Sequence, residues 1–128
     1  MLEGLYHVWF STKGRKEAVQ GELGDDARGL LIETAQRAGI RLLELEVVAD
    51  HAHLLVALAE GQTLPSVMHQ LKGATARSIF LKYPELKSDL GHNSFWQKGY
   101  GFRRLSSGEV ASVRRYMRTQ AERPLRRH

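Results

Sequence analysis

The fold is decided by residues 41–59, which read RLLELEVVADHAHLLVALA. Apolar and polar residues alternate through the first half of this stretch, as they do in a strand with one buried face. Asp50 marks a turn, and residues 51–59 form a second, more apolar run. The sequence therefore predicts a β-hairpin whose second strand starts with a pair of histidines, His51 and His53.

The other elements follow from the same patterns. Aromatic and β-branched residues predict strands, while apolar residues three and four positions apart predict helices. The predicted elements are a strand over 5–11, a helix from Asp25 or Asp26 to Gly39, a helix capped by Thr63 and closed by Pro84, a strand over 95–105 interrupted at Gly99 and Gly101, and a helix capped by Ser106 or Ser107. In chain order this predicts an α+β, ferredoxin-like (RRM-like) split βαβ sandwich: an antiparallel sheet with an extra C-terminal helix.

The composition fits one compact domain spanning residues 1–128. The chain has 128 residues, 42% of them hydrophobic, and domains commonly have about 100 to 150 residues. It contains no cysteine, so disulfides are excluded and a reducing compartment is suitable. No apolar run approaches the roughly 18 residues of a membrane span, and no P-loop is present. We therefore expect a cytoplasmic protein with no membrane partner and no nucleotide cofactor.

Positive charge is concentrated near the C-terminus. The net charge is +5, but residues 103–128 hold eight arginines and two glutamates, so the first 102 residues carry −1. A basic terminus is commonly a solvated tail. Here the arginines flank Tyr116, and a basic surface around a potential nucleophile indicates a polyanionic substrate.

Four side chains predict a metal site facing a nucleophile. On a strand His51 and His53 project to one side, whereas Ala52 turns to the other. On a helix Tyr116 and Gln120 are neighbours, because they are four residues apart. Two imidazoles and an amide leave open positions on Mg²⁺ or Mn²⁺ for a phosphate, which the phenol oxygen could attack. The buried stripe predicted for the same helix is Val110, Val113 and Met117, and its arginines are expected to point away from it.

Five segments, in order along nearly the whole chain, match a known pattern. They are YHVWF (6–10), DHAHLLV (50–56), LKGATAR (71–77), FWQKGY (95–100) and RYMRTQ (115–120). Together they resemble the single-tyrosine HUH transposases of small insertion sequences, which move as single-stranded DNA, and their REP-associated relatives. Two features depart from that pattern: the small Ala52 between the histidines, and the polar stretch 101–104.

The resemblance implies a single-stranded DNA transposase. His51 and His53 would bind the divalent ion, Gln120 would complete the ligand set, and Tyr116 would attack a DNA phosphate, giving a 5′-phosphotyrosyl enzyme and a free 3′-hydroxyl. A phenol with a pKa of about 10 is a weak nucleophile at neutral pH, so a nearby cation must help. The implied partners are single-stranded DNA with hairpins at the element ends and a second copy of the chain. In this homodimer, the tyrosine helix is expected to dock on the partner's histidines.

Basic residues elsewhere are candidate DNA contacts, although each could equally be an ordinary solvated charge. The candidates are Lys13, Arg15, Lys16, Lys72, Arg77, Arg103, Arg104, Arg114, Arg115 and Arg118. The remaining histidines, His7, His69 and His92, are assigned structural or surface roles.

Other functions fit less well. A histidine-triad hydrolase needs a third histidine where Leu55 stands. An RNA-binding sheet needs exposed aromatic residues on its central strands, and residues 42–59 contain none. A replication initiator or relaxase remains possible within the HUH class, and so does a domesticated protein that binds DNA hairpins without cutting them. Retention of both histidines, Tyr116 and Gln120 argues against the last.

Overall fold

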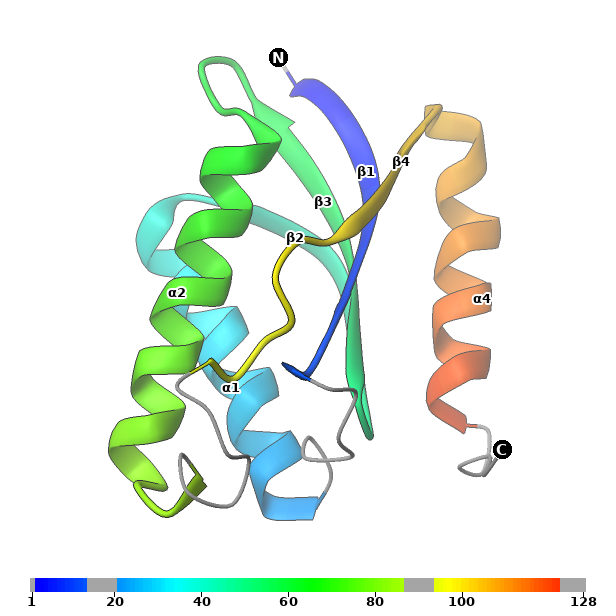
Figure 1. Ribbon diagram of the computed structural model, residues 1–128. Helices are drawn as coiled ribbons and strands as arrows, with labels where there is room; N and C mark the ends of the chain where they lie inside the picture. The colour runs from blue at the N-terminus through cyan, green and yellow to red at the C-terminus, as the bar shows by residue number, and fades with distance from the viewer. Residues whose placement is uncertain (1, 14–20, 87–93, 123–128) are drawn as a thin grey trace.

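The computed structural model describes residues 2–13, 21–86 and 94–122, and the side chains of 4–13, 21–86 and 94–119 (Figure 1). Its elements are β1 (Leu2–Ser11), α1 (Gly21–Ala38), β2 (Arg41–Val48), β3 (His51–Ala59), α2 (Leu64–Lys82), β4 (Gly101–Leu105), the short 3₁₀ helix η2 (Ser107–Glu109) and α4 (Val110–Glu122). The sheet order is β2-β3-β1-β4, with every neighbouring pair antiparallel. The expected α+β sandwich with an extra C-terminal helix is confirmed.

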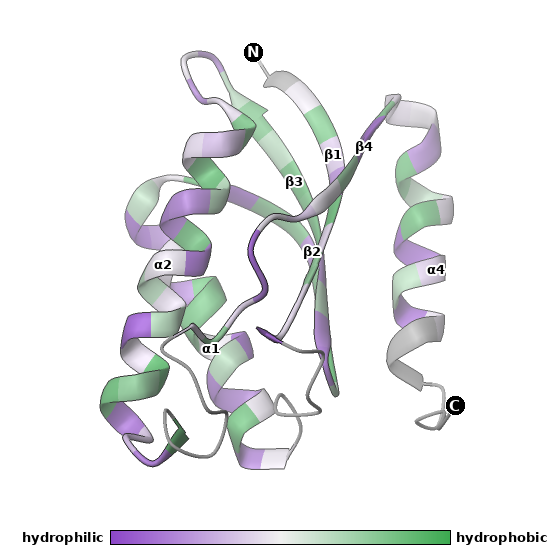
Figure 2. Ribbon diagram, in the orientation of Figure 1, coloured by the Kyte–Doolittle hydropathy of each residue, from purple (hydrophilic) through white to green (hydrophobic). Residues whose placement is uncertain are grey.

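Helices cover both faces of the sheet, two on one face and one on the other. In Figure 1, α1 and α2 lie on one side and α4 on the opposite side. One of the two central strands, β3, is therefore buried on both faces and is apolar along most of its length, as Figure 2 shows.

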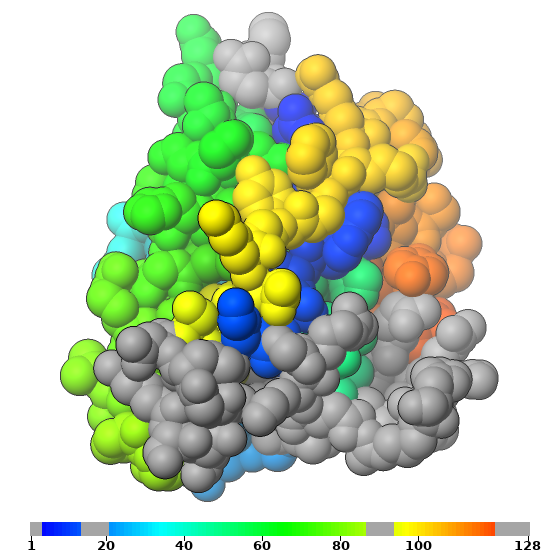
Figure 3. All heavy atoms as spheres, in the orientation of Figure 1, coloured from blue at the N-terminus to red at the C-terminus, as the bar shows by residue number. Residues whose placement is uncertain are grey.

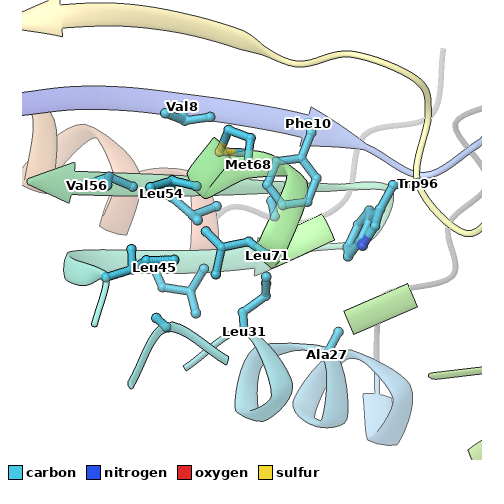
Figure 4. Packing of buried hydrophobic residues seen from close by; sticks show 14 of the residues in the cluster. Val8, Phe10, Ala27, Leu31, Leu45, Leu54, Val56, Met68, Leu71 and Trp96 are labelled. Atoms are coloured by element: carbon cyan, nitrogen blue, oxygen red, sulfur yellow. The ribbon is translucent and has the colours of Figure 1, made fainter. Parts of the chain in front are cut away.

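The main core lies between the sheet and the helices α1 and α2. Alternate residues of the strands, such as Phe10 and Leu54, meet Leu31 of α1 and Leu71 of α2 there (Figure 4). Trp96, from the segment before β4, closes one end of this core. At about 25 cal/mol per Å² of apolar area removed from water, this core is the principal source of stability.

A smaller core lies under α4. It consists of Leu55 on β3, Leu105 on β4, and Val113 and Met117 on the helix. Val110 packs against it and is partly buried. The stripe predicted for the last helix therefore faces the sheet, as expected, and Ser106 and Glu109 form a capping box before it.

Three predicted boundaries are wrong. Strand β1 begins at Leu2 rather than at Leu5. Helix α1 begins at Gly21 rather than at Asp25 or Asp26. Asp26 does not cap the helix, because its carboxylate accepts a hydrogen bond from Tyr83 and pairs with Lys82 at 2.9 Å, at the end of α2.

The predicted strand over 95–105 is shorter than expected, since β4 begins only at Gly101. The preceding segment makes one isolated bridge, between Thr12 and Trp96, and then turns through Gly99, whose φ of 84° is left-handed. In Figure 3 residues 94–105, in yellow, cross this face of the molecule between α2 and β1. This segment brings a loop to the edge of the candidate site.

Candidate active site

The predicted histidine pair lies on the α4 face of the sheet. The rings of His51 and His53 have centroids 4.8 Å apart, while Ala52 between them faces the main core. His51 Nδ1 lies 2.7 Å from a carboxylate oxygen of Asp50, in the turn between β2 and β3. A carboxylate on one ring nitrogen orients the imidazole and leaves the other nitrogen for a ligand.

A third histidine, His7, belongs to the same cluster. Its Nε2 lies 3.0 Å from Nδ1 of His53, and both residues are buried. Burial, together with His51 and His7, lowers the pKa of His53 to about 4, and burial and Arg103 lower the pKa of His7. His53 is therefore neutral at pH 7, which is the form that binds metals.

His7 was assigned a structural or surface role from the sequence, so its contact with His53 was missed. The signal that could have found it is strand alternation. Val8 faces the main core, so His7 must face the other side, where His53 also points. Using that signal required knowing that β1 pairs with β3.

The tyrosine reaches this cluster within a single chain. The ring of Tyr116 lies 6.2 Å, centroid to centroid, from both His7 and His53. Tyr116 is 50% exposed, whereas the next residue, Met117, is fully buried beneath the helix. Gln120 follows one turn later in α4, but its side chain lies outside the described residues.

Helix α4 is held to the sheet by polar contacts as well as by Met117. Arg114 donates a hydrogen bond to the carbonyl of Leu43 at 2.8 Å. Arg114 and Arg118 both approach the carboxylate of Glu44 on β2, at 3.6 and 3.4 Å. The expectation that these arginines point away from the sheet is wrong, because their side chains are long enough to fold back onto β2. The helix docks on its own sheet, so no partner is needed to bring Tyr116 to the histidines.

Trp9, His53 and Tyr116 line both of two hollows, and the boundary that these three residues share is called the ridge. The loop-side hollow, of about 370 Å³, is lined on its far side by His51 and residues 97–101. The helix-side hollow, of about 520 Å³, is lined by His7, Arg103, Ser112 and Val113. An extended chain could therefore cross the ridge with a segment in each hollow.

Lys72, a candidate DNA contact, also holds the wall of the loop-side hollow. Its ammonium donates to the carbonyl of Gln97 at 2.8 Å and to the carbonyl of Gly99. It also lies over the rings of Phe10 and Tyr100, at 5.6 and 6.0 Å from their centroids. Burial lowers its pKa. Lys72 thus holds residues 97–100 in place.

The other basic candidates are dispersed. Arg103 lines the helix-side hollow and pairs with Glu109 at 2.9 Å. Arg77 and Arg115 are exposed on α2 and α4. Arg104 lies on β4 opposite Tyr6, and Lys13 lines a groove beside α2. Arg15, Lys16 and also His92 lie outside the described residues.

The side chains present fit a divalent ion. Two imidazoles share one face, and each has one ring nitrogen already engaged, by Asp50 or by His7. In the part of the chain that the structure describes, no group of three or more histidines and carboxylates is placed to hold a metal. A site here therefore needs a further ligand, such as the amide predicted at Gln120.

Comparison with known proteins assigns the family. The family model described as "Transposase IS200 like" matches residues 2–120. The chain belongs to the IS200-like transposase family. Its fold and its histidine and tyrosine cluster are thus those of a member of a family of DNA-processing enzymes.

Relatives of this IS200-like transposase agree with the assignment. The ISDra2 transposase TnpA of Deinococcus radiodurans is 32% identical over 115 residues, covering 90% of this chain and 82% of the relative. The transposase for insertion sequence element IS200 of Salmonella typhimurium is 28% identical, covering 91% and 76%.

Two solved structures share the fold. A proposed transposase from Deinococcus radiodurans superposes with a TM-score of 0.74 at 30% identity, covering 91% of this chain and 89% of that one. A REP-associated tyrosine transposase bound to a REP hairpin gives a TM-score of 0.69 at 13% identity, covering 94% and 67%. Among the described residues, no helix has the length and apolar character needed to cross a bilayer.

Proposed function

We propose that this IS200-like transposase cleaves and rejoins single-stranded DNA with Tyr116 as the nucleophile. The observation that carries the proposal is the position of Tyr116, half-exposed and 6.2 Å from the ring of His53, beside the His51 and His53 pair. An accessible phenol next to paired imidazoles suits phosphoryl transfer, in which a nucleophile and a cation site must both reach one phosphate.

The covalent step exchanges one phosphoester bond for another. The phenol oxygen of Tyr116 loses its proton and bonds to phosphorus, and the bond from phosphorus to the 3′-oxygen breaks. The departing 3′-oxygen takes up a proton, so no proton is gained or lost overall. Rejoining reverses the step with a different 3′-hydroxyl. Because one ester replaces another, no nucleotide cofactor is needed.

His51, His53 and Gln120 would hold Mg²⁺ or Mn²⁺, which when bound supplies electrophilic activation of the phosphate. The protein's own part is to orient the ligands and the nucleophile. Asp50 orients His51, and His7 orients His53. Met117 and the arginine contacts with Glu44 hold the helix that presents Tyr116.

The proposed substrate is a DNA end marked by a hairpin. The REP-associated transposase of the same fold was solved with a REP hairpin. Net charge of +5, concentrated around Tyr116 in the sequence, favours a polyanion. We further propose a homodimer, because an element has two ends and each chain supplies one Tyr116.

The test is to trap the covalent intermediate. The chain is incubated with Mg²⁺ or Mn²⁺ and single-stranded DNA from the region flanking its gene, labelled at the 3′ end in one sample and at the 5′ end in another. The 3′ label should migrate with the protein on a denaturing gel, and the 5′ label should be released. Tyr116→Phe should lower the yield of the adduct at least about 10³-fold, because the ring packs as before but the attacking oxygen is gone.

Tyr83→Phe, a tyrosine change on the opposite side of the sheet, is the matched control and should keep the adduct. Chelation of the divalent ion should abolish it. An adduct that persists in Tyr116→Phe would disprove the assignment. Hairpin binding with no adduct under any metal would instead identify a non-cleaving hairpin-binding protein.

A further inference from the structure

Trp9 is a partly exposed tryptophan on the ridge of the candidate site. It is 38% exposed and lines both hollows, as do His53 and Tyr116. The other tryptophan, Trp96, is buried in the main core and donates a hydrogen bond to Thr75 at 2.9 Å. A large aromatic ring that is partly exposed beside the candidate site is available for contact with a ligand.

The position of the indole depends on Gly101. The two residues face each other across β1 and β4. A Cβ atom on Gly101 would lie 2.0 Å from Nε1 and 2.2 Å from Cε2 of Trp9, far inside van der Waals contact. The indole therefore rests over bare backbone, and the ring of His7 packs beside it at 5.0 Å. Gly101 is needed because a side chain at this position would occupy the space that the indole of Trp9 fills.

Charges lie on both sides of this ring. Lys98 lines the loop-side hollow and Arg103 lines the helix-side hollow. A DNA strand with a phosphate at Tyr116 can place one nucleotide in each hollow, because Tyr116 lines both. Sites for single-stranded DNA combine cations along the backbone with aromatic rings on which bases stack. The ridge offers both.

We propose that Trp9 is a stacking platform for a base adjacent to the phosphate that Tyr116 attacks. The proposal rests on the proposed function, because it takes single-stranded DNA as the ligand. Stacking accepts any base, so Trp9 contributes affinity and position while base identity is read elsewhere. Gly101 acts through Trp9 as a positioning residue.

Tryptophan fluorescence tests the proposal directly. The protein carries Tyr116→Phe so that DNA is not cut, and the probe is an oligothymidylate of roughly 12 nucleotides at low salt. Stacking should quench the emission of Trp9, while buried Trp96 gives a constant background. An abasic oligomer of equal charge should bind without quenching. Adding Trp9→Phe should remove the response to the oligothymidylate.

Affinity is measured in parallel by the anisotropy of a labelled oligonucleotide. Trp9→Leu should weaken binding about fivefold to a hundredfold, the range expected for the loss of one stacked base. Gly101→Ala should weaken it in the same direction, because the new methyl group displaces the indole without removing it. Phe102→Leu is the matched control. Phe102, on β4, is an exposed aromatic residue like Trp9, but it pairs with Val8, whose side chain faces the main core. Its replacement should therefore leave the affinity unchanged.

The outcomes separate this proposal from the one on which it rests. Binding without quenching, or a Trp9→Leu variant that binds as tightly as its parent and melts at the same temperature, would overturn the stacking role alone. Stacking by these measures with no Tyr116 adduct in the wild-type chain would overturn only the cleavage chemistry. Failure to bind any single-stranded oligonucleotide would overturn both.

Discussion

The two faces of the sheet are built differently. On the face covered by α1 and α2, strand residues and helix residues form one large apolar core. On the face covered by α4, a small core around Leu55 and Met117 leaves room for three histidines, Trp9 and Tyr116. Because side chains alternate along β1 and β3, the residues of the main core point to one face and the histidines and Trp9 point to the other. Substitutions on one face therefore need not disturb the other.

The larger apolar core lies on one face of the sheet, and the residues of the candidate site lie on the other. The α4 helix is attached by a few apolar side chains and by arginines reaching Glu44. A thin attachment of this kind opens locally at a lower free energy than the main core unfolds. Tyr116, the proposed nucleophile, is thus carried on the less firmly held layer.

The largest expected effect comes from emptying the main core. Leu71→Ala, at a fully buried position on α2, should lower the free energy of unfolding by about 2 to 5 kcal/mol. Leu81→Ala on the same helix is the control, because Leu81 is 83% exposed and should change stability by less than about 0.5 kcal/mol. Urea denaturation measures both. Equal losses for the two variants would contradict the assignment of the main core.

The matching change on the other face is Met117→Ala. We expect the opening of α4 to become easier by about 2 to 3 kcal/mol, while the sheet stays protected. Hydrogen exchange should then accelerate in α4 by roughly 30- to 150-fold with little change in β1 and β3. Cleavage should fall because Tyr116 is presented less often. Arg115→Ala, exposed on the same helix, should leave α4 protected.

If Met117→Ala exposed the sheet amides as much as those of α4, the two faces would form one cooperative unit. The distinction drawn between them would then be wrong.

Local patterns predicted the fold and every member of the histidine and tyrosine cluster except His7. His51 and His53 share a face because they are two residues apart on one strand, which any strand pattern reveals. His7 was missed because its partner is 46 residues away and cross-strand register cannot be read from either segment alone. The boundary of β4 was missed because Gly99 adopts a positive φ within a sequence that is aromatic enough for a strand.

Charge alone was a poorer guide to side-chain roles. Arg114 and Arg118 were expected to point outward from the helix, but their reach allows them to pair with Glu44 on β2. Lys72 stays a predicted DNA contact, but its positive charge did not reveal its hydrogen bonds. Its place against two carbonyls depends on the path of residues 97–100, which is irregular and follows no sequence period.

Lys72 lies on α2 and holds residues that line the loop-side hollow. Lys72→Met should show whether it supports this segment or contacts DNA. Loss of its bonds to Gln97 and Gly99 should cost about 1 to 2 kcal/mol of stability and slow cleavage about tenfold, because the wall of the loop-side hollow loosens. The salt dependence of DNA binding should stay unchanged. If Lys72 instead contacts a phosphate, the slope of log affinity against log salt should fall by about 0.7. Arg77→Met, exposed on the same helix, removes the same charge and is the control for stability, which it should change by less than about 0.5 kcal/mol.

The smallest expected effect concerns acid sensitivity on the α1 and α2 face. The hydrogen bond from Tyr83, and then the contact with Lys82, hold the pKa of Asp26 below its ordinary value. A carboxyl whose pKa is lower in the folded state contributes stability above its unfolded pKa, near pH 4, and loses that contribution as pH falls through the folded value. Asp26→Asn should therefore lower the melting temperature by at most a few degrees at pH 7 and by less at strongly acidic pH. For the neighbouring exposed Asp25→Asn, the difference in melting temperature from the wild type should not shrink at acidic pH. Hydrogen exchange of α4 should be the same in all three proteins. If Asp26→Asn lost as much stability at low pH as at pH 7, ionisation of this carboxyl would not be what links α1 to the end of α2.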